Sequence, residues 1–211
     1  MFFKTGPGEY GEGDLFIGVT VPNTRAVSKR YRDLPLEEID VLLDSKIHEH
    51  RLAGLVILGE RFRRAKSKKL RGELFDFYVS AFMRGRVNNW DLVDVSAPIF
   101  GQWLVDYPQK TFLLNLARSN DLWQKRISIM FTFAHIRNGD FGPTQHLSMI
   151  LLNDNHDLIH KAVGWMLREM GKRDVEVLRA FLAKHHRQMP RTMLRYAIEK
   201  LDADERRRWM N

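Results

Sequence analysis

Apolar residues recur at spacings of three and four along almost the whole chain after residue 21. This period places them on one face of an α-helix, and no segment has the alternating Val- and Ile-rich pattern of a strand. The predicted helices span residues 22–32, 35–43, 47–64, 68–84, 89–105, 108–118, 121–136, 143–153, 157–171, 174–187, 190–201 and 203–210. The pattern therefore predicts an all-α protein.

The first 21 residues are rich in glycine and lack a helical period, so we expect a mobile loop that ends in a short extended piece. GPGEYG (6–11) satisfies G-x-G-x-x-G, but it contains a proline, follows no predicted strand and is surrounded by acidic residues. Dinucleotide binding is therefore not expected. Further along, Pro35, Pro108, Pro143 and Pro190 stand where helices are expected to begin, and Asp106, Asn120, Asp121 and Asn155 at expected starts or breaks.

A local pattern occurs five times: a residue pair that ends in an ionisable side chain, followed by a stretch of small and apolar residues. Its second positions are 51, 94, 126, 161 and 195, separated by 43, 32, 35 and 34 residues. This is the period of a two-helix repeat, so we expect one repeat domain over residues 1–211, with a loop at 1–21 and stacked helix pairs at 22–211. In this register, one ionisable residue per repeat lies on a concave surface: Arg51, Asp94, Arg126, Lys161 and Arg195.

Aromatic residues share the helical spacing of these charged positions. Trp90, Trp123 and Trp165 lie three or four residues from Asp94, Arg126 and Lys161 respectively, and Arg168 follows Trp165 by three. Together they predict a cationic groove that contains tryptophans and one carboxylate. The alternative is structural, because helical tryptophans commonly lie in cores and an aspartate between helices is commonly a cap.

Composition narrows the chemistry that this groove could perform. The 211 residues include no cysteine, which excludes disulfides, a thiol nucleophile, thiolate-bound zinc and iron–sulfur clusters. No apolar run is long enough to span a membrane, and the chain start does not resemble a signal peptide, so a cytoplasmic protein without membrane contact is expected. The histidine pairs lack HExxH or a ligand-like arrangement of acids, so no metal is expected.

The net charge of +8 is concentrated in two blocks. Residues 61–86 hold nine basic and two acidic side chains, and residues 161–211 hold thirteen and seven. Such blocks are typical of a polyanion-binding surface, although solvated helix faces give the same pattern. The candidate non-specific DNA contacts are Arg63, Arg64, Lys68, Lys69, Arg191 and Arg195.

Five segments carry a family resemblance. They are FFKTGPGEYGEGD (2–14), NNWDLVD (88–94), LWQKRISI (122–129), HKAVGWMLREMGKRD (160–174) and MPRTMLRYAIEK (189–200). They resemble the signature segments of the DNA alkylation repair family, the AlkD-like alkylpurine DNA glycosylases. The resemblance implies a C-shaped, HEAT-like α-solenoid whose basic concave face holds duplex DNA. It also implies a base excision repair activity that hydrolyses the N-glycosidic bond of cationic N3- or N7-alkylated purines without a base-flipping pocket.

Roles are implied residue by residue at the matching motif positions. Asp94, Trp90, Trp165 and Arg126 are the implied catalytic residues; Asp94 would stabilise positive charge on the deoxyribose and orient water. The remaining candidate DNA contacts on this face are Arg168, Lys161, Trp123 and Lys125. Lys161 carries an alternative role, because a lysine could form a Schiff base and give lyase activity.

The expected partner is double-stranded DNA with alkylated purines, bound by a monomer that needs no cofactor or metal and associates with the nucleoid when on DNA. Family members have a helical segment ahead of the FFKTGPG-like stretch, in which this chain almost begins; Phe2 or Phe3 could supply an aromatic residue that the family contributes there. Two other functions stay open: a catalytically silent protein that recognises damaged, bent or branched DNA, and a protein-scaffolding solenoid.

Overall fold

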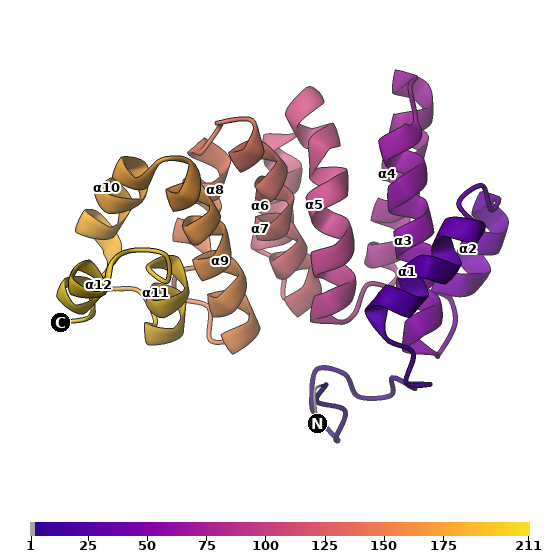
Figure 1. The fold of residues 1–211 in the computed structure, drawn as a ribbon, viewed down its shortest axis with the longest axis horizontal. Coiled ribbons are helices and arrows are strands. Elements are labelled where there is room, and N and C mark those ends of the chain that lie inside the picture. The colour runs from indigo at the N-terminus through magenta and orange to yellow at the C-terminus, as the bar shows by residue number, and fades with distance from the viewer. Residues whose placement is uncertain (1–2) are drawn as a thin grey trace. The chain divides into compact units, whose positions relative to one another are not determined.

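The computed structural model describes residues 3–211, which form twelve α-helices (Figure 1). In chain order they are α1 Val21–Arg30, α2 Leu36–Leu43, α3 His48–Arg64, α4 Lys68–Met83, α5 Trp90–Asp106, α6 Lys110–Ala117, α7 Leu122–Arg137, α8 Gly142–Ile150, α9 Asp157–Arg173, α10 Val175–His185, α11 Arg191–Ala197 and α12 Ala203–Met210. The described residues contain no strand, and an isolated parallel bridge joins Leu15 to Ile47. The all-α prediction is confirmed, because each predicted helix is present.

Several helix starts follow from local chemistry. The Asp121 carboxylate accepts a hydrogen bond from a backbone N–H in the first turn of α7, as an N-cap does. Pro143 lies in the first turn of α8, where its missing N–H costs no hydrogen bond. Pro35 and Pro190 are the residues immediately before α2 and α11. These positions agree with the starts predicted from the sequence.

The sequence repeat coincides with alternate helices. Its five positions, residues 51, 94, 126, 161 and 195, fall on α3, α5, α7, α9 and α11. The helix between each successive pair, α4, α6, α8 and α10, completes a two-helix repeat. The fold is therefore the predicted α-solenoid.

The chain divides into two compact units, unit 1 (Met1–Trp103) and unit 2 (Leu104–Asn211). The division falls within α5, three residues before that helix ends. Unit 1 contains the N-terminal segment, α1 to α4 and most of α5, whereas unit 2 contains the end of α5 and α6 to α12. A single domain over residues 1–211 stays a prediction.

In unit 1, α3 is the central helix and contacts α1, α2 and α4 (Figure 1). The core contains the stacked rings of Tyr78 and Phe100, whose centroids are 4.2 Å apart, with Phe62 beside Phe100. The Tyr78 hydroxyl is hydrogen-bonded to Ser96 Oγ at 2.9 Å, which joins α4 to α5. These contacts hold α5, the helix that carries Trp90 and Asp94, against α3 and α4.

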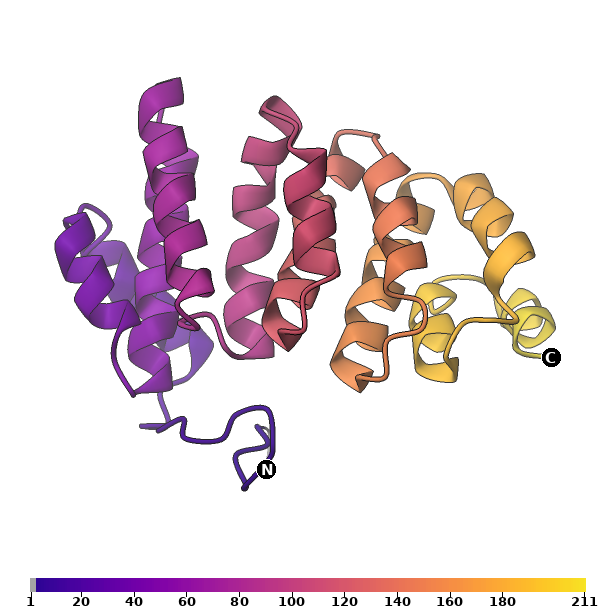
Figure 2. The same cartoon turned by 180° about the vertical axis from the view of Figure 1, so that it is seen from behind.

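In unit 2, α9 takes the central position and contacts α7, α8, α10 and α11 (Figures 1 and 2). Gly164 permits the close packing of α9 on α11, since an added Cβ would lie 2.5 Å from both the Met193 carbonyl oxygen and Tyr196 Cβ. The buried side chains of α9 are Ile159, Ala162, Val163, Met166, Leu167 and Met170. The candidate residues on α9 therefore stand on a helix that is packed from several sides.

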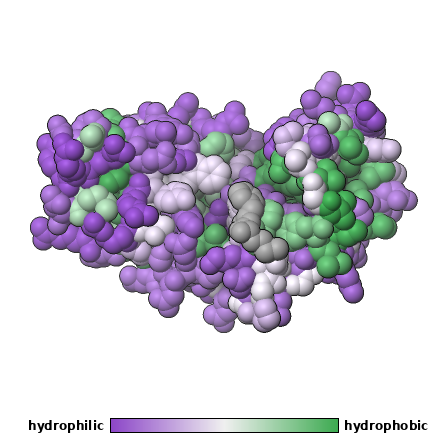
Figure 3. Space-filling model, turned by 60° about the horizontal axis from the view of Figure 1, so that its bottom comes forward, coloured by the Kyte–Doolittle hydropathy of each residue, from purple (hydrophilic) through white to green (hydrophobic). Residues whose placement is uncertain are grey.

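Unit 1 also exposes apolar side chains. Leu15, Ile17 and Val19 alternate along the extended part of the N-terminal segment, and Val27 and Tyr31 lie on or next to α1, each at least 39% exposed. Hydrophobic surface gathers over these elements at the right of Figure 3. Within residues 3–211, no helix is both long and apolar enough to cross a membrane.

Candidate functional site

The glycine-rich N-terminal segment folds back on itself near its start. The backbone N–H of Gly11 donates to the carbonyl of Lys4 at 2.9 Å. A Cβ on residue 11 would lie 2.8 Å from that carbonyl oxygen, so the close approach requires glycine. Carboxylates of Glu9 and Glu12 accept hydrogen bonds from the backbone N–H groups of residues 6 and 8. The segment expected to be mobile thus has its own internal hydrogen bonds.

The same segment is attached to the first turn of α3. The His48 backbone N–H donates to the Leu15 carbonyl at 2.8 Å. The buried carboxylate of Glu49 accepts hydrogen bonds from the backbone N–H groups of Ile17, at 3.1 Å, and Gly18, at 2.9 Å. Backbone donors of the extended piece are therefore satisfied by α3 rather than by a neighbouring strand.

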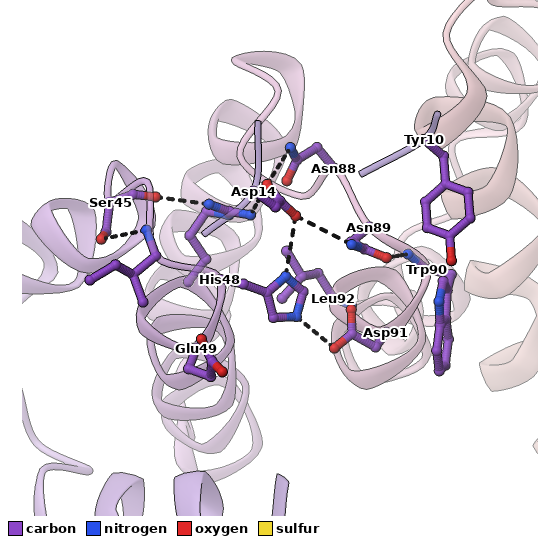
Figure 4. A network of polar contacts seen from close by, with 12 residues as sticks. Tyr10, Asp14, Ser45, His48, Glu49, Asn88, Asn89, Trp90, Asp91 and Leu92 are labelled. Atoms are coloured by element: carbon purple, nitrogen blue, oxygen red, sulfur yellow. Dashed lines mark hydrogen bonds and ion pairs between the residues drawn. The ribbon is translucent and has the colours of Figure 1, made fainter. Parts of the chain in front are cut away.

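A buried polar network joins this segment to both α3 and α5 (Figure 4). His48 lies between two carboxylates: its Nδ1 is 3.4 Å from Asp14 Oδ2 and its Nε2 is 2.8 Å from Asp91 Oδ2. Arg51 donates to the other oxygen of Asp14 at 2.6 Å. Asn89 donates to Asp14 at 3.3 Å and accepts from the Trp90 backbone N–H at 2.8 Å. Asp14 thus accepts hydrogen bonds from two parts of unit 1, α3 and the residues that precede α5.

The electrostatics of this network favour the charged form of its histidine. Burial opposes a charged imidazole, but hydrogen bonds and attraction from Asp14 and Asp91 outweigh it and raise the pKa of His48 to about 9. Burial also opposes ionisation of Asp14, yet hydrogen bonds from His48 and the charge of Arg51 lower the pKa of that carboxyl. The side chains of His48, Asp14, Arg51 and Asp91 are only 2%, 4%, 6% and 12% exposed.

Aromatic rings cover one side of the network. Phe16 stacks on the His48 ring with centroids 4.6 Å apart, and Phe3 stacks on Phe16 at 4.8 Å. Phe3 also stacks on Trp90, the first residue of α5, at 5.6 Å. Of the two phenylalanines expected to contribute an aromatic ring, Phe3 does contact Trp90, whereas Phe2 lies outside the described residues.

Trp90 and Asp94 are half-buried and stand one turn apart on α5. Burial, together with the charge of Asp94, raises the pKa of the Tyr78 hydroxyl, which is hydrogen-bonded to Ser96. The Asp94 carboxylate is thus close enough to the core of unit 1 to act on a buried hydroxyl. The two residues expected to be catalytic in this unit share the first two turns of one helix.

The candidates on α9 of unit 2 occupy successive turns. Trp165 is half-buried and its indole N–H donates to the Glu169 carboxylate at 3.0 Å. Lys161 forms an ion pair with Asp157 at 2.6 Å, one turn earlier. Both side chains are therefore oriented by carboxylates of their own helix.

Two arginines of unit 2 differ in exposure. Arg168 forms an ion pair with Glu199, and its side chain is 17% exposed. Arg126 is buried, at 4% exposed, and donates to the carbonyl of Leu158 at the start of α9. Arg168 could exchange its protein partner for a phosphate at the surface, whereas Arg126 links α7 to the backbone of α9.

The remaining candidates of unit 2 lie at or near the surface. Lys125 forms an ion pair with Asp154 at 2.7 Å, and Trp123 on the same helix is half-buried. Arg195 is exposed on α11, and Arg191 at the start of that helix donates to the backbone carbonyl of Met210 at 2.5 Å. These contacts fix the positions of the side chains within unit 2.

The basic block around residue 65 lies at the far end of α3 from His48. With a rise of about 1.5 Å per residue, the two ends of this 17-residue helix are about 25 Å apart. Arg64 forms an ion pair with Asp33 at 2.8 Å, and Arg63 is within 3.6 Å of a carboxylate on α3. Lys68 and Lys69 are exposed in the first turn of α4. These four cations are therefore remote from Trp90 within unit 1.

Two histidines form hydrogen bonds at the start of α9. His156 Nδ1 accepts a hydrogen bond from the Leu158 backbone N–H at 3.1 Å, and His160 contacts the Asp154 carbonyl. Among residues 3–211, no group of three or more histidine and carboxylate side chains could hold a metal ion.

Sequence reasoning missed the network around His48. Asp14 was part of a family-like segment, and Asp91 lies inside the WDLVD motif, but neither was expected to contact the histidine. The partners of His48 are 34 and 43 residues away, and a periodic pattern carries no information about such pairs. The one available signal was the concentration of polar residues at the two motifs, at GEGD and NNWD.

Comparisons with known proteins agree with this fold and these motifs. The model of the DNA alkylation repair enzyme family matches residues 1–201. Among solved structures, a predicted DNA alkylation repair enzyme from Enterococcus faecalis has a similar fold, with a TM-score of 0.72, 17% sequence identity and 92% of each chain covered. The comparison with curated proteins found no match. Since the family model matches nearly the whole chain, the protein belongs to the DNA alkylation repair enzyme family.

Proposed function

We propose that this protein is a DNA glycosylase that removes cationic N3- or N7-alkylated purines from duplex DNA. Membership in the DNA alkylation repair enzyme family supports a role in the repair of alkylated DNA. The observation that carries the finer proposal is the position of Trp90 and Asp94 one turn apart on α5, with the Phe3 ring on Trp90. This arrangement presents an aromatic surface and a carboxylate together.

Cleavage of the glycosidic bond of such a purine needs few protein groups. An alkylated purine that carries a positive charge is already a good leaving group, so its departure needs no general acid. As the glycosidic bond breaks, positive charge develops on the deoxyribose, and a carboxylate nearby stabilises it and orients the attacking water. Asp94 has this role in our proposal.

The tryptophans would favour a cationic nucleotide over a neutral one. The face of an indole attracts a cation by about 0.5–2 kcal/mol, depending on desolvation. Trp90 and Trp165 are half-buried, so part of each ring remains available to a ligand. Because the base leaves unaided, we propose that it is not flipped into a pocket, in contrast to enzymes that read a base edge after extrusion.

DNA would be held through its phosphates. Arg168 and Lys161 have carboxylate partners at the surface, and a phosphate can replace a carboxylate in each ion pair. Arg126 donates to the Leu158 carbonyl and would add a fixed positive charge at the start of α9.

The reaction we propose is hydrolysis without a Schiff base. Although burial opposes ionisation of Asp157, the hydrogen bond and charge of Lys161 lower the pKa of that carboxyl. The ion pair favours the ammonium form of Lys161, which has no lone pair for attack on a sugar carbon. Borohydride trapping of a protein–DNA adduct would contradict this part of the proposal.

The test is release of 7-methylguanine and 3-methyladenine from methylated duplex DNA. We expect release by the native chain and a decrease of about 100-fold or more in the single-turnover rate for Asp94→Asn at matched DNA occupancy, since a preorganised charge is lost. Asp106→Asn makes the same change at an exposed position at the other end of α5 and should retain the native rate.

Absence of release by the native chain, together with salt-sensitive DNA binding, would overturn the glycosylase proposal. It would instead favour a silent protein that recognises damaged or distorted DNA. Equal rates for the native chain and Asp94→Asn would remove Asp94 from the mechanism.

A further inference from the structure

We propose that His48 is a positioning residue for the aromatic surface of Phe3 and Trp90, acting as a cationic clasp between the glycine-rich segment and the first turn of α5. The proposal rests on the proposed glycosylase function, because that surface is where the alkylated nucleotide would lie. It assigns to His48 no contact with DNA. His48 is 2% exposed and can act only through the groups that it holds.

The hydrogen-bond geometry indicates an imidazolium. Both ring nitrogens of His48 face carboxylate oxygens, Asp14 on one side and Asp91 on the other (Figure 4). A neutral imidazole has one N–H donor and would turn a lone pair toward the second carboxylate, whereas the protonated ring donates to both. The two contacts together therefore require the cation.

Charge balance leads to the same conclusion. The cluster contains the two carboxylates of Asp14 and Asp91 and the guanidinium of Arg51, all largely buried. A protonated His48 gives two positive and two negative charges, whereas a neutral one leaves an unbalanced negative charge in the interior. Unbalanced buried charges are costly, so the neutral form would loosen these contacts.

The clasp reaches Trp90 by two routes. Asp91 directly follows Trp90 in the chain, and its other oxygen accepts the Leu92 backbone N–H, so it is fixed to the helix start. On the second route, Asp14 accepts from Asn89, whose side-chain oxygen accepts the Trp90 backbone N–H. Both carboxylates that His48 joins therefore constrain the residue that begins α5.

The aromatic contacts extend this constraint to the N-terminal segment. The rings of Phe3 and Phe16 both pack on the His48 ring, with centroids 5.0 Å and 4.6 Å away. Phe3 then stacks on Trp90. If the clasp opened, the segment would lose its ionic link to Asp91 of α5, and Phe3 would be held less firmly over Trp90.

The first experiment compares His48→Gln with a matched control, His50→Gln. His50 lies on the same helix, and its Nδ1 is hydrogen-bonded to Ser45 Oγ at 3.0 Å rather than to Asp14 or Asp91. We expect His48→Gln to slow single-turnover release of 7-methylguanine at saturating DNA about tenfold or more, because a small displacement of a positioned group has such effects. The dissociation constant for DNA should change less than twofold, since His48 does not touch DNA.

A second readout does not depend on activity. A protease that cleaves after glutamate can attack Glu9 and Glu12 within the segment. In His48→Gln these bonds should be cleaved about tenfold faster than in the native chain or in His50→Gln, since the broken ion pairs no longer oppose local opening.

Restoring charge balance distinguishes the clasp from simple misfolding. His48→Gln leaves Asp14, Asp91 and Arg51 with one excess negative charge, and adding Asp91→Asn removes it. The double variant should regain part of the protection against cleavage and part of the release rate. A double variant that is worse than His48→Gln in both readouts would overturn the clasp.

Unchanged cleavage and unchanged release in His48→Gln would also overturn the proposal. A native chain that releases no base would contradict the proposed function instead. In that case the cleavage rates still decide whether His48 holds the segment, so the two failures can be told apart.

Discussion

Arg168 and Lys161, the two cations of α9 expected at DNA phosphates, each contact a carboxylate in the structure. At the scale of single residues, the proposed phosphate contacts would therefore replace existing ion pairs. The binding free energy gained from each phosphate contact is reduced by the free energy of the ion pair that is broken. For exposed pairs this is commonly below about 1 kcal/mol, so the exchange is feasible.

Removing the competing carboxylate should strengthen DNA binding. We expect Glu199→Gln to lower the dissociation constant for duplex DNA about two- to fivefold, because Arg168 loses its contact with Glu199 and retains a longer one, at 3.5 Å, with Glu169. Fluorescence anisotropy at fixed salt measures it. Glu176→Gln changes the net charge equally at an exposed site paired with Arg179, and should have a smaller effect. Equal effects of the two variants would contradict the exchange.

The His48 clasp predicts a pH dependence of stability. The pKa of His48 is raised from 6.5 to about 9 on folding, so its contribution to the free energy of unfolding is complete below pH 6.5 and is lost as the pH rises through 9. The groups that face it are Asp14, Asp91 and, through Asp14, Arg51.

Urea unfolding of the native chain and His48→Gln at several pH values between 6 and 10 checks this. The difference in unfolding free energy should be about 3 kcal/mol at most near pH 6 and should shrink toward pH 10. A difference that stays constant across this range would show that folding does not raise the pKa of His48.

At the scale of helices, the sequence predicted much of the fold because amphipathic periodicity is a local property. The ranges of α2, α3 and α12 agree within one residue at each end. The expected helix at 190–201 is shorter, since α11 ends at Ala197 and residue 202 adopts an extended conformation to cap α12. Such a competition between adjacent helix ends is decided by tertiary packing rather than by period.

The contact between α9 and α11 should be sensitive to one methyl group. Gly164→Ala would place its Cβ 2.5 Å from the Met193 carbonyl, so the two helices must separate. We expect a loss of about 1–3 kcal/mol in the free energy of unfolding, as for other overpacked sites. At Gly142 a Cβ would meet only Asp140 Oδ1, at 3.4 Å, so Gly142→Ala should be nearly neutral in the same urea titration. A neutral Gly164→Ala would show that this packing is loose.

At the scale of the whole molecule, charge patterning indicated a polyanion partner, and the family match agrees with a DNA role. What composition could not reveal is how many of the cations already have protein partners. Nor could it show that Arg63 and Arg64 lie about 25 Å along α3 from His48, with Lys68 and Lys69 next to them at the start of α4. The sequence predicts Trp90 and Asp94 as site residues from one short motif, but it does not indicate Asp14 and His48, whose contacts depend on long-range pairing.

The basic block should affect affinity without affecting chemistry. We expect a triple variant, Arg63→Gln, Lys68→Gln and Lys69→Gln, to reduce the slope of log K against log salt by about 2.7, or 0.9 per lost phosphate contact. Its single-turnover rate at saturating DNA should equal that of the native chain, because these residues are remote from Trp90.

The matched control for this variant replaces three arginines of α12, by Arg206→Gln, Arg207→Gln and Arg208→Gln. It makes the same change in net charge and should alter the slope less. If both triple variants alter the slope equally, the block contributes only through net charge.

The attachment of the N-terminal segment sets an order for events during synthesis. Residues 3–20 leave the ribosome before the helices of unit 1, and Asn89, one of the partners of Asp14, follows Asp14 by 75 residues. At ordinary rates of translation this interval is roughly 4 to 15 seconds. The contact of Leu15 with His48 of α3 can form about halfway through this interval. The contacts with Asn89 and Asp91 can form only at its end. This segment is thus synthesised before the helices of unit 1 and yet is among the last parts of the unit to reach its final contacts.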